Sequence, residues 1–445
     1  MKYLFVACLL CLSVLSAVAK VPAMNKIRLT NNWEYLKGDL GGIWEAVRPA
    51  APGSSEAVPI WQPVTLPHCF NAEDAVDPDV NYYEGPGWYK TLLAIDNPYR
   101  NGRIVLDFDG AGQKTDVYVY TTHVGSHVGG YDSWNVDITD AVKAFLGSKD
   151  AKRFKGKVPL SIRCDNSRDL EMIPSDLADF NIYGGLYRYL NLVYLPEVSF
   201  EQIRLESSLS SNLKEGILKV KTSFYNPEDI RKADVTVSVY DADRKPVFSK
   251  TLEGILPLGD QLLAEMKIKN PVLWDVDVPQ LYTCELTVKT PDQTFTTEER
   301  FGFRHTEFKD KGPFFLNGKR LLLRGTHRHE DPAGVAQAMT EDMMRREMRM
   351  MKDMGVNFIR LGHYQQSEII LDLCDELGIL VWEEIPWCRG GLGGDVYKKQ
   401  ARRMLANMIV QHHNHPAVII WGLGNENDWP NDFNTFDKSA IRAFM

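Results

Sequence analysis

Cysteines are few in this sequence and do not cluster. The chain of 445 residues contains seven. Cys8 and Cys11 lie in an apolar run near the N-terminus, and the other five are odd in number and far apart: Cys69, Cys164, Cys284, Cys374 and Cys388. This spacing fits neither a zinc-binding motif nor a disulfide framework. We therefore predict that the five are mostly buried thiols.

An excess of positive charge is also lacking. Lysine and arginine total 51 against 59 aspartate and glutamate, which gives a formal net charge of −8. Proteins that bind nucleic acid usually carry a basic footprint. The composition therefore excludes nucleic acid as an expected partner.

Long apolar runs are lacking after the first 19 residues. Residues 1–19 combine a positive Lys2, an apolar core over residues 4–14, and small residues at Ala17 and Ala19. This is the pattern of a secretory signal peptide. No later stretch is long and apolar enough to span a bilayer. We predict a secreted or periplasmic protein with no membrane span after signal cleavage; an uncleaved anchor or a lipid anchor is the alternative.

The first two-thirds of the chain has the pattern of β-strands. Within residues 20–200, segments such as 103–109 alternate apolar and polar side chains between glycine-rich turns. Several short strands of this kind predict a sandwich or jelly roll. The same alternation returns within residues 201–305, for example at 216–224. A segment of about 100 residues suits a second β-sandwich.

Residues 306–445 change to strands that alternate with helices. The predicted strands are 320–325, 356–361, 379–382 and 417–423, and the helices between them are 340–355, 367–377 and 397–411. Alternation of this length predicts βα units around a parallel sheet.

Polar residues follow each of these four strands. In chain order they are Thr326, His327, Arg328, His329 and Glu330; Arg360, His363 and Tyr364; Glu383, Glu384 and Trp387; and Asn425 with Glu426. The carboxyl ends of parallel strands meet at one edge, where active sites lie. Four such sets favour one shared site over four unrelated helix caps.

The fourth strand carries the clearest signal for chemistry. Ala417 to Leu423 is apolar and rich in β-branched residues, which is typical of a fully buried strand, and Asn425 and Glu426 follow it. A partly buried carboxyl has a raised pKa and can hold a proton near neutral pH, as a general acid must. The alternative is that both residues only cap the next helix.

The segment from Gly424 to Asp428, with Trp421 before it, resembles the acid/base motif of glycoside hydrolase family 2. This family contains β-galactosidases, β-glucuronidases and β-mannosidases. The resemblance implies that Glu426 is the acid/base at the end of the fourth strand of a (β/α)8 TIM barrel, and that Asn425 contacts the sugar 2-hydroxyl. Further segments resemble the family's sugar-binding domain (64–68, 87–90 and 179–188) and its immunoglobulin-like domain (270–275 and 279–283).

The resemblance implies a multidomain fold and further site residues. The domains would be a jelly roll over 20–200, an immunoglobulin-like sandwich over 201–305 and an incomplete TIM barrel over 306–445, after the signal peptide. Five residues would bind substrate or border its pocket: Asp179, His329, Arg360, His363 and Trp387. Asp179 is alternatively a turn residue, and Trp387 is alternatively part of the core.

Metal and cofactors are not predicted. Some β-galactosidases of this family bind magnesium through a glutamate and a histidine shortly after the third strand. The corresponding stretch here is Trp387-Cys388-Arg389-Gly390, which has neither residue.

The function implied is that of an exo-acting retaining β-glycosidase, most like a β-galactosidase, acting on sugars of oligosaccharide or polysaccharide origin. A retaining glycosidase needs a second carboxylate as nucleophile, and the family places it after the seventh strand. The chain ends in the fourth predicted helix, so we expect a truncated enzyme. β-Glucuronidase or β-mannosidase specificity, a non-catalytic carbohydrate-binding remnant, and completion by a separate polypeptide are the alternatives. The sequence leaves the sugar and the oligomeric state open.

Overall fold

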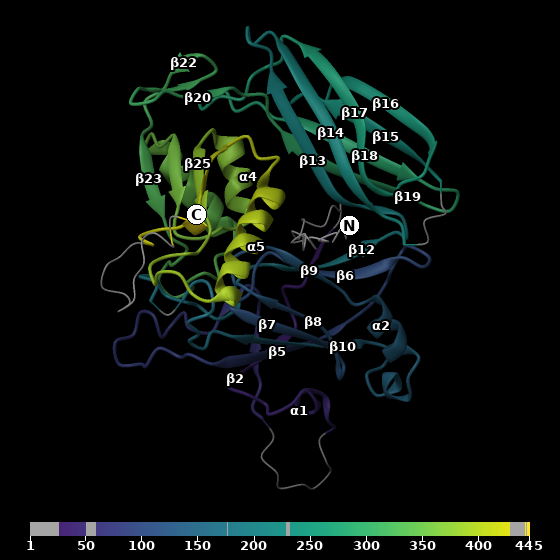
Figure 1. Cartoon of the computed structure of the whole chain (residues 1–445). Coiled ribbons are helices and arrows are strands. Elements are labelled where there is room, and N and C mark those ends of the chain that lie inside the picture. Colours follow the sequence, from purple (N-terminus) through teal and green to yellow (C-terminus); the bar gives the residue numbers. More distant parts are fainter. Residues whose placement is uncertain (1–25, 50–58, 176, 228–231, 428–440, 442) are drawn as a thin grey trace, which may run out of the picture.

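The computed structural model describes residues 26–49, 59–175, 177–227, 232–427, 441 and 443–445. The predicted signal peptide and most of the predicted fourth helix lie outside these residues. Figure 1 shows three parts: an N-terminal β-domain, a second β-domain above it, and a mixed helix–strand part that contacts both. In the part of the chain that is described, no helix is long and apolar enough to cross a membrane.

The N-terminal domain is the predicted jelly-roll sandwich. One antiparallel sheet has the order β1-β12-β6-β9, and the other β3-β2-β5-β10-β7-β8. The strands are β1 (Ile27–Arg28), β2 (Trp33–Lys37), β3 (Gln62–Val64), β5 (Pro86–Leu93), β6 (Arg103–Phe108), β7 (Lys114–Val119), β8 (Thr122–Val128), β9 (Trp134–Asp137), β10 (Val158–Asp165) and β12 (Leu190–Leu195). A short pair, β4 (His68–Cys69) with β11 (Gly185–Leu186), and the helices α1 (Trp44–Val47) and α2 (Thr139–Leu146) complete it.

The second domain is the predicted immunoglobulin-like sandwich. Its sheets have the orders β13-β14-β17 and β16-β15-β18-β19. Apolar side chains at alternate positions of both sheets form the core between them, as in sandwiches generally. The strands are β13 (Ser199–Leu209), β14 (Glu215–Tyr225), β15 (Ala233–Tyr240), β16 (Pro246–Ile255), β17 (Gly259–Lys269), β18 (Tyr282–Lys289) and β19 (Thr294–Phe301).

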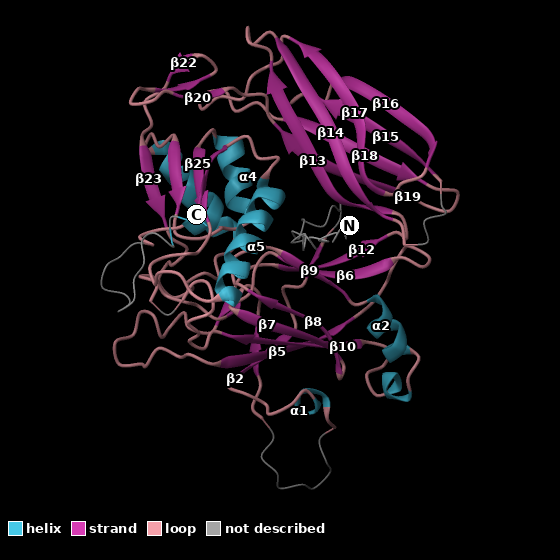
Figure 2. Cartoon of the chain, viewed as in Figure 1, coloured by secondary structure: helices cyan, strands magenta, loops and turns pink. Residues whose placement is uncertain are grey.

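The third part contains the predicted parallel sheet. A small antiparallel sheet of β20 (Thr306–Phe308), β21 (Phe314–Leu316) and β22 (Lys319–Arg320) leads into it. The parallel strands follow in the order β23-β24-β25-β26, with helices packed on them (Figure 2). The elements are β23 (Gly325–Arg328), α3 (Glu341–Asp353), β24 (Phe358–Leu361), α4 (Glu368–Leu377), β25 (Leu380–Glu384), α5 (Asp395–His412) and β26 (Val418–Gly422).

The three helices begin and end close to their predicted limits, for local reasons. The Thr340 side chain caps α3 by accepting a hydrogen bond from the Met343 N–H, and Ser367 caps α4 in the same way. Gly378 ends α4 in the left-handed conformation, with φ of 65°, which costs glycine little. Met344 and Met348 of α3 are buried in the core, as their spacing predicts.

The first parallel strand begins later than predicted. β23 starts at Gly325, where pairing with Phe358 of β24 begins, whereas the apolar run predicted a strand at 320–325. Leu322 in that run is 70% exposed, and the Arg324 N–H donates to the Asn357 side chain at 2.7 Å. The run is therefore a connection into the strand, and His327 lies inside β23.

The fourth parallel strand is less buried than expected. Val418 and Gly422 are buried, but Ile419, Ile420 and Trp421 are only partly so. Among the described strands, β26 pairs with β25 alone and forms an edge of the sheet. The prediction of a fully buried strand is wrong for this reason.

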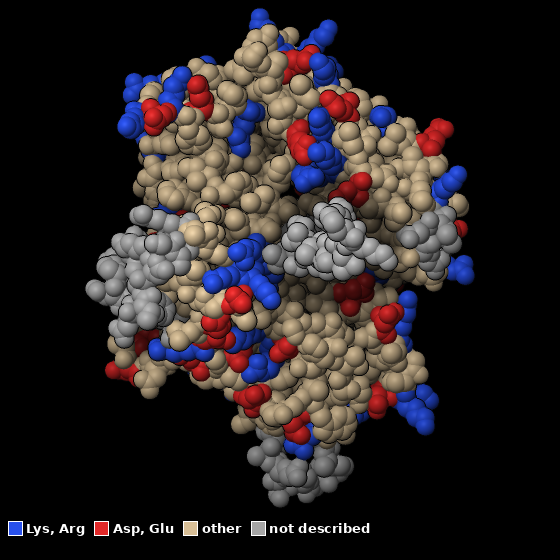
Figure 3. All heavy atoms as spheres, in the orientation of Figure 1, with Lys and Arg blue, Asp and Glu red and all other residues tan. Residues whose placement is uncertain are grey.

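Buried polar contacts fix the jelly roll against the barrel segment. Arg188 donates to Glu330 at 2.8 Å and to the Gln365 carbonyl at 2.7 Å. Asn407 of α5 donates to the buried Asp132 at 2.6 Å. On the face shown in Figure 3, acidic and basic side chains are interspersed over all three parts.

The five cysteines of the predicted mature chain are all free and buried. This confirms the prediction of buried thiols rather than a disulfide framework.

Candidate active site

The carboxyl ends of the four parallel strands bring the predicted polar residues together. Glu384, the last residue of β25, is fully buried and lies at the centre. Arg360 of β24 binds its carboxylate with distances of 2.9 and 3.0 Å from Nη2 and 3.2 Å from Nε. His363 Nδ1 lies 2.6 Å from Glu384 Oε1. Glu384 therefore orients two of the residues that the sequence placed in the site.

Asn425 is joined to this group. Arg360 Nη2 donates to its side-chain oxygen at 2.9 Å. Its backbone N–H donates to the Trp387 carbonyl at 2.9 Å, and its carbonyl accepts from the Arg389 N–H at 3.0 Å. These contacts hold the segment after β26 against the segment after β25.

Glu426 follows Asn425 in a left-handed backbone conformation, with φ of 47°. This conformation is uncommon for residues other than glycine and recurs where surrounding structure positions a functional group. The side chain is exposed, which corrects the expectation of a partly buried carboxyl. The correction has the same cause as that for β26, which is an edge strand within the described residues.

The jelly roll contributes Asp179 to the same place. This exposed side chain accepts a hydrogen bond from Cys388 Sγ at 3.0 Å, and Asn425 Nδ2 lies 3.4 Å from the same sulfur. Burial raises the pKa of the Cys388 thiol to about 12, so it remains protonated and can donate. One thiol thus links the predicted substrate contact of the jelly roll to Asn425.

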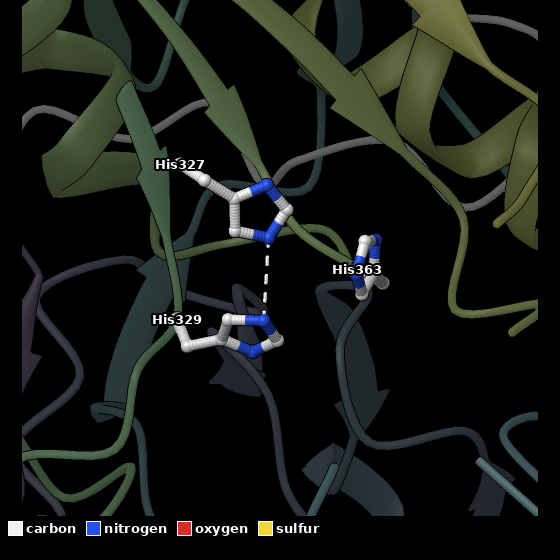
Figure 4. A group of neighbouring side chains, drawn as sticks. All are labelled: His327, His329 and His363. Carbon is white, nitrogen blue, oxygen red and sulfur yellow. Dashed lines mark hydrogen bonds between the residues drawn. The ribbon is translucent and has the colours of Figure 1, made fainter. Parts of the chain in front are cut away.

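Three histidines lie together at the ends of the first two parallel strands: His327 and His329 from β23 and its end, and His363 after β24 (Figure 4). His327 Nε2 and His329 Nε2 are 3.2 Å apart. Partial desolvation of the His327 ring, with the neighbouring histidines and Arg360, lowers its pKa to about 4. Burial and His363 also lower the pKa of His329. The rings of His327 and His329 are therefore neutral at physiological pH.

Trp387 does not offer a face to this site. Its ring is 1% exposed and packs edge-on against Tyr397 and Phe444, while its Nε1 donates to the Gly391 carbonyl at 2.8 Å. The expectation of a sugar platform is therefore wrong, and the alternative of core packing holds. Trp387 contributes its backbone carbonyl to the site, and this carbonyl accepts the hydrogen bond from the Asn425 N–H.

The other glutamates near the strand ends are held by buried partners. Glu383 is fully buried beside His412, with Oε2 2.8 Å from Nδ1. Glu330 is 2% exposed between Arg188 and Arg328. Neither glutamate therefore offers a free carboxylate to the group of Asn425, Glu426 and Asp179.

Three residues of this group could not be given a role from the sequence alone. Glu384 drew attention only as one of a pair, His327 only as a polar residue after a strand, and Cys388 only as a buried thiol. For Glu384 and His327 the strand-end position was the usable signal. Cys388 gave no signal, because its role depends on a contact with Asp179, 209 residues away in the chain.

Chemically, the group combines an exposed carboxyl with an amide, a guanidinium, neutral imidazoles and a second carboxylate from another domain. Such groups hydrogen-bond several hydroxyls at once, and a carboxyl at a strand end can exchange protons with a bound ligand. A jelly roll, an immunoglobulin-like sandwich and a barrel segment with this site define the class of multidomain glycoside hydrolases.

Family comparisons agree across the chain. The sugar-binding domain of glycosyl hydrolases family 2 matches residues 40–196, a further domain of the family matches 198–304, and its TIM barrel domain matches 307–443. The chain belongs to glycosyl hydrolase family 2, and the predicted family and fold class are confirmed.

The similar proteins and structures carry the names of two different enzymes, β-glucuronidase and β-galactosidase. A crystal structure of Parabacteroides merdae β-glucuronidase with glycerol in its active site is 98% identical, with a TM-score of 0.95, over 97% of this chain and 55% of that one. A Bacteroides fragilis β-glucuronidase is 32% identical over 82% of this chain and 53% of its own. A Thermoanaerobacter pseudethanolicus β-galactosidase is 28% identical over 88% and 50%. The chain spans about half the length of the curated relatives it matches.

Proposed function

We propose that this chain is the acid/base-bearing part of an exo-acting retaining β-glucuronidase that removes terminal sugars from glycans or smaller glycosides. The observation that carries the proposal is the network that joins Asn425, the residue before Glu426, to Arg360, His363 and Asp179 at one edge of the parallel sheet, by way of Glu384 and Cys388. Glu426 is the acid/base in this proposal. Its exposed carboxyl has room to reach the oxygen of a glycosidic bond.

The neighbouring residues bind the hydroxyl groups of the substrate in this proposal. Asn425, oriented by Arg360 and Cys388, donates to the sugar 2-hydroxyl. His363 and His329 contact further hydroxyls, and Asp179 reaches the substrate from the jelly roll. The neutral imidazole of His329 suits this task, because such a ring offers one donor and one acceptor.

The choice of glucuronide rests on the relatives. The P. merdae structure and the B. fragilis protein are both named β-glucuronidases and match this chain at higher identity than the named β-galactosidase. β-Galactosidase, which the sequence alone favoured, is the second candidate, because relatives of that name match most of the chain.

A panel of nitrophenyl glycosides tests the specificity. The full-length enzyme that contains this chain is expected to hydrolyse the β-glucuronide at least about tenfold faster, by kcat/KM, than the β-galactoside or β-mannoside. A preference for the galactoside would transfer the assignment to the second candidate. Binding of glycans with no hydrolysis of any substrate would support the carbohydrate-binding remnant instead.

The nucleophile is the second requirement of a retaining mechanism. It must lie about 5–5.5 Å from the acid/base on the same pocket. Glu330, Glu383 and Glu384 are each buried and engaged by a cationic or imidazole partner, so none is free to attack an anomeric carbon. We expect the 445-residue chain, expressed alone, to hydrolyse no aryl glycoside above background.

This expectation is tested by measuring aryl glycoside hydrolysis by the purified, mass-verified chain and by its Glu426→Gln variant. Turnover that disappears in the variant would contradict it and would reveal a second working carboxylate within these residues. Equal background in both agrees with it. We also propose export by way of the predicted signal peptide, which N-terminal sequencing of the secreted protein checks.

A further inference from the structure

The three-histidine cluster has the geometry of a metal site. His327, His329 and His363 each present one ring nitrogen, and the three nitrogens lie within 4.8 Å of one another. Two nitrogens bound to one tetrahedral Zn²⁺ at about 2.0–2.1 Å are about 3.3 Å apart. His327 Nε2 and His329 Nε2, which share a hydrogen bond, are 3.2 Å apart, and this separation is close to the value for two ligands of one ion.

The third ligand needs only a small movement. The widest separation in the cluster exceeds the tetrahedral value by at most about 1.5 Å. His327 is exposed and His363 is held by Glu384, so the His327 ring is the one expected to move. Figure 4 shows the His327 and His329 rings turned toward each other, with the His363 ring beside them.

The surroundings of the cluster also suit a metal. Nδ1 of His363 is hydrogen-bonded to Glu384 at 2.6 Å, which fixes this ring and leaves Nε2 as its ligand nitrogen. Histidine ligands of metals usually have such a carboxylate behind them. The Arg360 guanidinium beside the cluster is paired with the Glu384 carboxylate.

We propose that His327, His329 and His363 form a binding site for a borderline divalent metal ion, with Zn²⁺ as the preferred ion. Imidazole nitrogen selects Zn²⁺, Co²⁺, Ni²⁺ or Cu²⁺ over Mg²⁺ and Ca²⁺, which prefer oxygen ligands. Three protein ligands leave a fourth position for water or a ligand hydroxyl. This site is distinct from the magnesium site of some β-galactosidases, because it uses none of the residues after the third strand.

The experiment measures metal binding directly. Tag-free chain, stripped with a chelator, is titrated with Co²⁺ and its visible absorption is recorded, since tetrahedral and octahedral Co²⁺ differ strongly in intensity. Zn²⁺ is then added in competition with a chromophoric chelator. We expect one Co²⁺ per chain with the intense spectrum of a tetrahedral site, and displacement by one Zn²⁺.

Single variants locate the site. His327→Ala and His329→Ala are each expected to weaken Zn²⁺ binding at least about tenfold. His327 is exposed, so its variant retains the fold, which circular dichroism verifies. The matched control is His123→Ala, an exposed histidine of β8 outside the cluster, which should bind Zn²⁺ like the unchanged chain.

Two results would overturn the proposal. One is wild-type affinity for Zn²⁺ in both His327→Ala and His329→Ala. The other is no saturable binding of Co²⁺ or Zn²⁺ to the unchanged chain. Neither readout uses hydrolysis, so the metal site can fail while the proposed glycosidase function stands, and the reverse.

Discussion

At the scale of single residues, the site depends on side chains that hold others in place. Glu384 has no contact with solvent, yet it orients both Arg360 and His363. Arg360 in turn orients Asn425. Glu426 differs from all of these, because it is exposed and positioned by its backbone. This contrast separates the residues that build the site from the one proposed to transfer a proton.

The first residue-scale prediction concerns Glu426 in the full-length enzyme. Glu426→Ala should slow the hydrolysis of glucuronides with poor leaving groups by about two to four orders of magnitude, which is the usual contribution of general acid catalysis. Nitrophenyl and more activated glucuronides need little protonation and should lose less. Kinetics across a series of leaving-group pKa values measures this, and an equal loss for all of them would remove Glu426 from the acid role.

The second concerns Asp179. Asp179→Asn should raise KM for the preferred glycoside severalfold in the full-length enzyme, because a substrate contact and the Cys388 hydrogen bond are both weakened. Thermal unfolding should stay unchanged, since the side chain is exposed. Asp140→Asn, an exposed aspartate of α2, is the control. Unchanged KM and kcat in Asp179→Asn would exclude it from the site.

At the scale of elements, the start of β26 determines where Asn425 and Glu426 lie. His415 Nδ1 is 2.6 Å from the buried Asp375, whose other oxygen accepts from the Ala417 N–H at 2.9 Å. Arg304, which follows the second β-domain, donates to the Val418 carbonyl at 2.5 Å. The strand is thus fixed by α4 on one side and by the end of the immunoglobulin-like domain on the other.

This anchor predicts a pH dependence of stability. Burial lowers the pKa of His415, but the Asp375 carboxylate more than offsets this and raises it to about 9. Between the unfolded value of about 6.5 and 9, the folded state keeps a proton that the unfolded state has lost. The contribution of His415 is therefore complete below about pH 6.5 and is lost as the pH rises to about 9, by up to about 1.4 kcal/mol per pH unit.

Urea denaturation across this pH range checks the prediction. His415→Gln should flatten the fall in the free energy of unfolding between about pH 6.5 and 9. The exposed His305 gives the control variant His305→Gln, which should retain the wild-type slope. The same slope in His415→Gln as in the unchanged chain would contradict the raised pKa.

At the scale of the whole molecule, the jelly roll and the barrel segment share a buried charge network. Glu330 lies between Arg188 of the jelly roll and Arg328 of β23, and all three are nearly inaccessible to solvent. Its Oε1 also receives the Ser367 N–H at the start of α4. Asp179 reaches Cys388 between the same two parts of the molecule.

Glu330→Ala should therefore destabilise the chain strongly. It removes the carboxylate that pairs with the buried Arg188 at 2.8 Å and with Arg328 at 3.5 Å, and breaking a buried ion pair typically costs about 3–5 kcal/mol. Glu347→Ala is the matched control, because Glu347 pairs with the same Arg328 at 2.8 Å but is one-third exposed, so a smaller loss is expected than for the buried Glu330. Denaturant unfolding followed by tryptophan fluorescence compares the two. Equal effects would show that the Arg188 contact contributes little.

The sequence by itself determined the architecture and the family. Apolar and polar residues that alternate with period two predicted the strands of the two sandwiches. Helical periodicity, with Thr340, Ser367 and Gly378 at helix ends, predicted the helices. Both signals are local in the chain. Arg360, His363, Asn425 and Glu426 could be assigned to one site, since the carboxyl ends of parallel strands share an edge. Local composition misplaced β23, however, since an apolar run does not tell whether a partner strand is present.

Tertiary structure alone decided how these residues are held. That Trp387 is core, that Glu426 is exposed, that Cys388 joins Asp179 to Asn425, and that three histidines converge all depend on contacts between distant segments. Burial and hydrogen bonding of a side chain are set by what packs around it. A single sequence carries that information only through the complete fold, which is why pattern and spacing grouped the candidate residues but did not predict how they are arranged.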